Sequence, residues 1–187
     1  LLKAGSDRIA RSVHFIENHD EQRAANTMSV AVNRAAALTI LGLPGMRLIQ
    51  HGQLTGARRY QPVQLARHAV EVQDEALTAL YRQLLETLSN TPVGFGHAQV
   101  IAPLPAWPDN QTHQNYIVVQ WQSEPPDFCI LVVNLAPHRG QCYAPLNVPH
   151  LAERDWRMKN LLGEEKWVRY GEDLARQGLY LDVRSEE

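Results

Sequence analysis

The sequence has few of the features that mark several common classes of protein. Its two cysteines, Cys129 and Cys142, fall in neighbouring strand-like runs, so we expect free buried thiols and no disulfide framework. No apolar run approaches the ~20 residues that a membrane-spanning helix needs. Lys and Arg number 18 against 20 Asp and Glu, without long runs of either sign, which indicates neither a nucleic-acid partner nor a membrane partner.

Metal and cofactor motifs are also scarce. The eight histidines show no H-x-x-x-H or Cys/His ligand spacing, and Gly94-Phe95-Gly96 lacks the third glycine of a dinucleotide-binding loop. We therefore expect no metal and no cofactor in this segment. The chain begins Leu1-Leu2-Lys3, which we interpret as a truncation that says nothing about secretion.

The first half of the chain alternates short apolar runs with helical patterns. With 44% hydrophobic residues among 187, the chain can bury a real core. We expect strands over 11–16 and 46–50 and helices over 22–41 and 74–88, and the order strand, helix, strand implies a parallel pair. The first helix has an apolar stripe at a spacing of three and four, namely Met28, Ala31, Val32, Ala35, Leu38 and Leu41.

The second half reads as an antiparallel β domain. Its strand-like runs are separated by Gly, Pro and Asn, and they cover 98–102, 116–122, 128–135, 141–146, 166–170 and 178–183. The segment 135–141 is typical of a hairpin connection, and 173–182 resembles the last strands of a β-sandwich domain. A boundary near residue 95 divides the chain into domains 1–95 and 96–187.

One polar stretch stands out where the first expected strand ends, Phe15-Ile16-Glu17-Asn18-His19-Asp20. Asn18 could simply cap the next helix, with Glu21 completing a capping box. Alternatively, polar groups at this end of a barrel or open α/β sheet lie where such folds carry out their chemistry.

The motifs that follow favour the second interpretation. After the Ala-rich helix come Leu43-Pro44-Gly45-Met46-Arg47-Leu48-Ile49 and His51-Gly52-Gln53. In this order the motifs resemble the end of the catalytic barrel of the α-amylase superfamily of glycoside hydrolases. There N-H-D closes the seventh strand, and a P-G-x-x-x-I-x-x-G-Q run forms the eighth strand and its loop.

The resemblance implies an α/β part followed by an all-β part. Residues 1–95 would be the last two β/α units of a (β/α)8 TIM barrel, and 96–187 the antiparallel β-sandwich domain behind it. Because a whole barrel needs roughly 250 residues, the natural protein would supply the upstream barrel strands before Leu1.

The resemblance also implies a retaining glycosidase or transglycosidase acting on an α-glucan or maltooligosaccharide. Asp20 matches the carboxylate that stabilises the transition state, His19 matches the imidazole that binds sugar hydroxyls, and Asn18 would hold the turn. The nucleophilic Asp and the general-acid Glu have no counterpart in these residues, and the family assigns no such role to Glu17. These 187 residues would therefore not be catalytically competent alone.

Two other hypotheses remain open: a non-catalytic carbohydrate-binding or structural relative of the same fold, and an independent small α/β domain with a β appendage. The pair Arg58 and Arg59 could bind a phosphorylated sugar, but a solvated basic turn is the simpler interpretation. The four tryptophans could stack on sugars, although core or rim packing in the β domain is simpler; they are Trp107, Trp121, Trp156 and Trp167.

Overall fold

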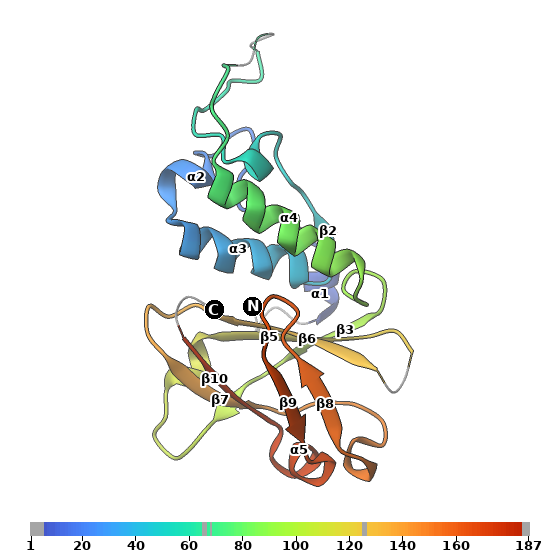
Figure 1. Ribbon diagram of the computed structural model, residues 1–187. Helices are drawn as coiled ribbons and strands as arrows, with labels where there is room; N and C mark the ends of the chain where they lie inside the picture. The colour runs from blue at the N-terminus through green and yellow to red at the C-terminus, as the bar shows by residue number, and fades with distance from the viewer. Residues whose placement is uncertain (1–5, 65–66, 68, 125–126, 185–187) are drawn as a thin grey trace.

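The first half of the chain contains the longer helices (Figure 1). The computed structural model describes residues 6–64, 67, 69–124 and 127–184. The helices are α1 (Ser6–Ala10), α2 (Ala24–Thr27), α3 (Val30–Gly42) and α4 (Glu75–Ser89), with a short 3-10 helix, η2, at Gln53–Thr55. No helix among the described residues is long and apolar enough to cross a membrane.

Strands β1 (Val13–His14) and β2 (Met46–Arg47) pair in parallel, as the strand-helix-strand order predicted. Both are much shorter than expected. Backbone hydrogen bonds from Met46 to Ser12 and from Leu48 to His14 continue the ladder by one step at either end. Strand β1 therefore occupies only the middle of 11–16, and β2 only the first two residues of 46–50.

The expected helix over 22–41 is wrong as one continuous element, because it breaks between α2 and α3. Met28 is extended, and the Ser29 hydroxyl caps α3 by accepting a hydrogen bond from the Val32 N–H. Of the apolar stripe, Leu38 and Leu41 are buried, whereas Val32 is exposed. The new start at Ser29 places the polar Asn33 on the buried face of α3 instead.

Helix α4 confirms the expected helix over 74–88 to within one residue. Asp74 caps it by accepting from the Leu77 N–H at 3.1 Å, which is the role of a short acidic side chain at a helix start. The inward face carries Leu77, Tyr81 and Leu84, all buried.

The second half is built from small antiparallel sheets, as expected. One sheet has the order β3-β5-β6, a second has β10-β7-β4, and β8 pairs with β9. Their bounds are β3 His97–Ile101, β4 Leu104–Pro105, β5 Tyr116–Gln122, β6 Phe128–Asn134, β7 Gly140–Ala144, β8 Trp156–Lys159, β9 Lys166–Arg169 and β10 Leu179–Val183. Short helical turns η3 (Thr112–Asn115) and η4 (Leu151–Glu153) lie between strands.

Two elements of this half were missed and one segment was wrongly assigned. Strands β4 and β8 were not expected; β4 is only two residues long and therefore has no alternation to read. The run 173–182 contains the helix α5 (Gly171–Gln177) before β10 begins. The chain turns between them at Gly178, whose φ of +87° favours glycine.

The expected hairpin across 135–141 is also wrong. Strand β6 pairs with β5, whereas β7 pairs with β10 and β4, so the connection passes from one sheet to the other. The buried Asn134 secures the crossing: its Nδ2 donates to the carbonyls of His138 and Val183, and its Oδ1 accepts from the Ala136 N–H.

The β3-β5-β6 sheet is covered on both faces (Figure 1). Alternate residues of β5 point to opposite sides: Val119 and Trp121 pack with α3 and α4, whereas Tyr116 and Val118 pack with the β10-β7-β4 sheet. One hydrophobic cluster therefore includes residues from both sides of residue 95.

Candidate active site

The chain leaves β1 through a turn that Asn18 organises. The Asn18 Oδ1 accepts hydrogen bonds from the backbone N–H groups of Asp20 at 2.8 Å and Glu21 at 3.1 Å. No helix starts here, because α2 begins only at Ala24, so the capping-box interpretation is wrong. Asn18 closes a polar turn and does not cap a helix.

The side chains of His19 and Asp20 project from this turn into solvent. They are 54% and 76% exposed, and the His19 Nε2 lies 3.4 Å from the Asp20 Oδ2. An exposed imidazole and carboxylate side by side can contact hydroxyl groups of a ligand with little desolvation of their own.

Glu17, next to this turn, points the opposite way into the protein and is 1% exposed. Its Oε2 accepts from the Ala24 N–H at 2.6 Å, which caps the start of α2, and its Oε1 lies 3.0 Å from the Arg23 Nη2. Burial raises the pKa of the Glu17 carboxyl, while the Ala24 N–H and the Arg23 charge act in the opposite direction.

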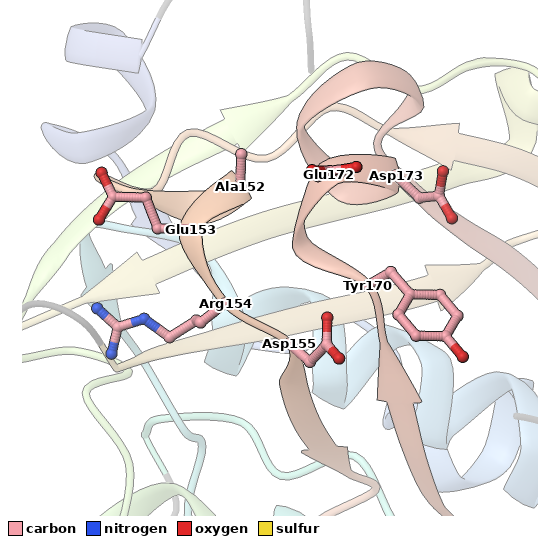
Figure 2. Close-up of a pocket in the computed structure, with 7 residues that line it drawn as sticks. All are labelled: Ala152, Glu153, Arg154, Asp155, Tyr170, Glu172 and Asp173. Carbon is pink, nitrogen blue, oxygen red and sulfur yellow. The ribbon is translucent and has the colours of Figure 1, made fainter.

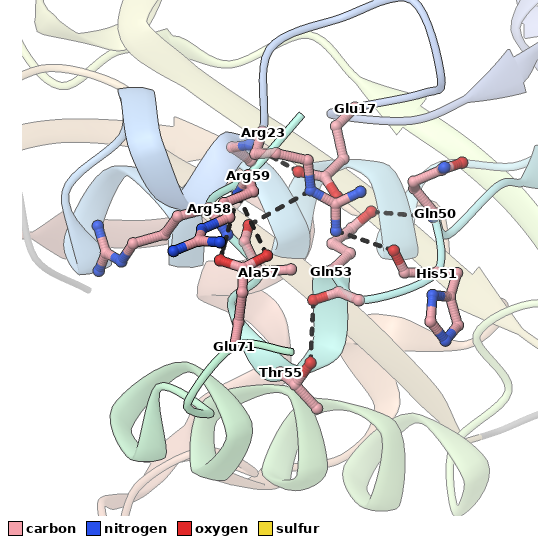
Figure 3. A network of polar contacts seen from close by, with 12 residues as sticks. Glu17, Arg23, Gln50, His51, Gln53, Thr55, Ala57, Arg58, Arg59 and Glu71 are labelled. Carbon is pink, nitrogen blue, oxygen red and sulfur yellow. Dashed lines mark hydrogen bonds and ion pairs between the residues drawn. The ribbon is translucent and has the colours of Figure 1, made fainter. Parts of the chain in front are cut away.

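Arg23 links this turn to the loop that follows β2 (Figure 3). It is 5% exposed, and besides pairing with Glu17 it donates from Nη2 to the His51 carbonyl at 2.8 Å and from Nε to the Ala57 carbonyl at 3.3 Å. Gly52 has a φ of +86°, and a Cβ there would lie 2.7 Å from the Arg23 Nη2. The glycine thus leaves the space that the guanidinium occupies.

A series of buried side-chain hydrogen bonds also anchors this loop. Gln53 donates from Nε2 to the Tyr81 hydroxyl at 3.0 Å, and that hydroxyl donates to the Asn33 Oδ1 at 2.9 Å. All three side chains are buried, so the loop is fixed to both α3 and α4. Burial raises the pKa of the Tyr81 hydroxyl, which keeps it a neutral donor.

Replacing Tyr81 by Phe should therefore destabilise the protein by about 1–3 kcal/mol, because the buried amide of Gln53 and the buried oxygen of Asn33 each lose a partner. Urea unfolding of the natural protein measures this loss. Tyr170→Phe is the matched control, since Tyr170 is exposed. Equal unfolding midpoints for the two variants would contradict the anchoring role of Tyr81.

Arg58 and Arg59 form a basic turn that acidic residues of the same chain engage. Arg58 donates to the Ala25 carbonyl at 2.6 Å and to the Asp74 Oδ2 at 3.0 Å. The Glu71 carboxylate accepts from the backbone N–H groups of both arginines. These contacts brace the loop between β2 and α4 (Figure 3).

A surface hollow lies elsewhere, beside α5 and away from the helices α3 and α4 (Figures 1 and 2). It is lined by Ala152, Glu153, Arg154, Asp155, Tyr170, Glu172 and Asp173, none of which belongs to the turn of residues 18–20. Within the described ranges, no group of three or more His, Cys, Asp or Glu side chains is arranged to hold a metal ion.

The tryptophans divide between core and surface. Trp121 and Trp156 are buried, and Trp107 and Trp167 are half exposed. The Trp121 ring packs in the cluster that joins α3 to the β3-β5-β6 sheet, and its Nε1 donates to the Gly42 carbonyl at 2.7 Å.

Sequence reasoning named Asn18, His19 and Asp20, and the structure places all three in one turn at the end of β1. It missed the pairing of Glu17 with Arg23 and the carbonyls that Arg23 binds. Glu17 lies between Ile16 and the polar Asn18, so its neighbours in the sequence did not mark it as a buried, paired charge.

No family model matches the sequence, and no curated protein sequence matches it. Solved structures do. A maltogenic α-amylase from Thermotoga neapolitana matches 94% of the chain with a TM-score of 0.64 at 15% identity. An α-amylase from Geobacillus thermoleovorans, complexed with acarbose, matches 97% with a TM-score of 0.67 at 13% identity. A debranching enzyme from Nostoc punctiforme, soaked with acarbose, matches 98% with a TM-score of 0.61 at 13% identity.

The chain has the fold of one part of these α-amylase-family enzymes, as the sequence motifs predicted. It spans 40%, 38% and 34% of the length of the three solved chains, in the order given. Their remaining length has no counterpart in these residues.

Proposed function

We propose that this chain is the C-terminal portion of an α-amylase-type glycoside hydrolase or transglycosylase that acts on α-glucosidic bonds with retention of configuration. The observation that carries the proposal is the Asn18-His19-Asp20 turn at the end of a parallel strand, held against the loop that follows the neighbouring strand. The match to α-amylase-family structures over 94–98% of the chain supports it.

In this proposal the exposed Asp20 carboxylate stabilises the positive charge that develops on the sugar in the oxocarbenium-like transition state. His19 hydrogen-bonds hydroxyls of the sugar being cleaved, and Asn18 holds the turn that presents both. The short strands β1 and β2 with α3 and α4 are the last two β/α units of a (β/α)8 barrel, and the sheets β3 to β10 form the β-sandwich domain behind it.

The covalent chemistry requires groups beyond this segment. A retaining glycosidase needs a nucleophilic carboxylate and a general acid about 5 to 5.5 Å apart. Glu17 can serve as neither, because it is buried, caps α2 and pairs with Arg23. The nucleophile and the acid come from upstream barrel strands of the natural protein, and these residues alone do not catalyse.

The proposed substrate is an α-glucan or maltooligosaccharide. Two of the similar structures contain acarbose or were soaked with it, and one is a maltogenic amylase. The segment requires no cofactor in this proposal, and its partners are the substrate and the upstream strands, with neither nucleic acid nor membrane involved.

The natural protein incubated with maltoheptaose should release products whose new reducing ends are initially α anomers. Retention through a covalent glycosyl-enzyme requires this outcome, and proton NMR of the anomeric region in the first minutes measures it before mutarotation. Initial β anomers would contradict the retaining mechanism. Absence of any product would favour the non-catalytic relative.

A further inference from the structure

We propose that Arg23, paired with Glu17, is a positioning residue that sets the geometry of the Asn18-His19-Asp20 turn against the loop of residues 51–57. This inference rests on the proposed function, because it concerns the same turn. It differs from the family's known chemistry in assigning a role to two charged side chains that point away from the proposed substrate.

The geometry makes Arg23 the connection between the two segments. One guanidinium reaches a carboxylate next to the turn and two backbone carbonyls, of His51 and Ala57, at either end of the second loop. Only a planar, multiply donating group can serve acceptors in these different directions at once. Glu17 completes the link, since its second oxygen holds Ala24 at the far side of the turn.

The loop of residues 51–57, which Arg23 binds, is itself held in place. The buried hydrogen bonds from Gln53 to Tyr81 and from Tyr81 to Asn33 fix it to α3 and α4. Within the turn, the Asn18 Oδ1 holds the backbone N–H groups of Asp20 and Glu21. Glu17 and Arg23 connect the turn to this fixed loop.

The Glu17–Arg23 ion pair is buried, so a test variant has to keep a charge beside Glu17. Removing Glu17 would leave the Arg23 charge without its partner in the interior, and that alone can unfold a protein. Arg23→Lys keeps the charge beside Glu17, but a single ammonium on a flexible stem cannot bind both carbonyls in the same geometry. Gly52→Ala disturbs the guanidinium from the other loop, because its Cβ would lie 2.7 Å from the Arg23 Nη2.

In the natural protein, Arg23→Lys and Gly52→Ala should each lower kcat on maltoheptaose by about 10- to 100-fold, the effect of misplacing a reacting group by about 1 Å. We expect KM to change far less. The assay is run at a temperature well below the thermal unfolding midpoint of each variant. Arg59→Lys is the matched control, because the Arg59 side chain is exposed in the same loop region, and its kcat should stay unchanged.

Amide hydrogen exchange of the same proteins provides a readout that does not depend on activity. The N–H groups of Asp20 and Glu21 should exchange faster in Arg23→Lys than in the wild type or in Arg59→Lys. Unchanged exchange at these amides, or an unchanged kcat in a folded Arg23→Lys variant, overturns the proposal. If the wild type hydrolyses nothing, the proposed function fails, and exchange alone then decides whether Arg23 positions the turn.

Discussion

Replacing Asp20 by Asn in the natural protein is expected to lower kcat on maltooligosaccharides by at least about 10²- to 10³-fold, which is the usual cost of removing one group that stabilises transition-state charge. The amide keeps the size of the side chain and loses its negative charge. The backbone hydrogen bond from the Asp20 N–H to Asn18 is unaffected. Initial rates of reducing-sugar release measure the effect.

The Asp20→Asn variant should lose activity without losing stability. Asp20 is 76% exposed, and surface substitutions of this kind change the free energy of unfolding by about 0.5 kcal/mol or less. Glu21→Gln is the matched control, since Glu21 is the exposed carboxylate next in sequence, and we expect it to retain full activity. Equal activity of Asp20→Asn and wild type would replace the enzyme proposal with the non-catalytic carbohydrate-binding relative.

Replacing Trp121 by Ala is expected to lower the free energy of unfolding by about 3–5 kcal/mol, the typical cost of truncating a buried large aromatic side chain. Trp121 is 3% exposed in the cluster that joins α3, α4 and the β3-β5-β6 sheet. Its loss also leaves the Gly42 carbonyl without the indole donor. The guanidinium of Arg47, 6.0 Å from the ring centroid, loses its aromatic contact.

Denaturant unfolding of the natural protein tests this expectation. Trp167→Ala is the control on the β9 surface, where the ring is 41% exposed. This variant should lower the free energy of unfolding much less. Trp121→Phe retains most of the packing but has no N–H donor. Its loss of unfolding free energy should therefore fall between those of Trp121→Ala and Trp167→Ala. A Trp121→Ala variant as stable as Trp167→Ala would mean that the helices and the β3-β5-β6 sheet do not depend on this contact.

Predictions from the sequence were accurate where one local pattern acted alone. The leucine spacing of α4 and its Asp74 cap lie within a single helix, so periodicity placed it to within one residue. Strand β5 was placed at 116–122 as observed, because its apolar run is bounded by polar residues. The helix predicted over 22–41 is broken, because Ser29 is a strong capping residue that starts a new helix, and an Ala-rich pattern alone does not reveal such a break.

The candidate site shows the same division. The motif located Asn18, His19 and Asp20 because they are consecutive in the sequence. The two carbonyls that Arg23 binds, those of His51 and Ala57, lie 28 and 34 residues away along the chain, and no spacing rule connects a side chain to backbone carbonyls at that distance. The burial of Glu17 beside Arg23 was likewise undetermined until the loop after β2 was in place.

The amino-acid sequence by itself determined the parallel order of the first two strands, the antiparallel character of the second half and the turn that carries the proposed chemistry. These properties follow from side-chain periodicity and from short runs of neighbouring residues. Only the tertiary structure decided that β6 and β7 belong to different sheets and that a buried ion pair ties two loops together. Both depend on which distant segments meet, because pairing of strands and burial of charges are settled by the partner that each group finds in the folded chain.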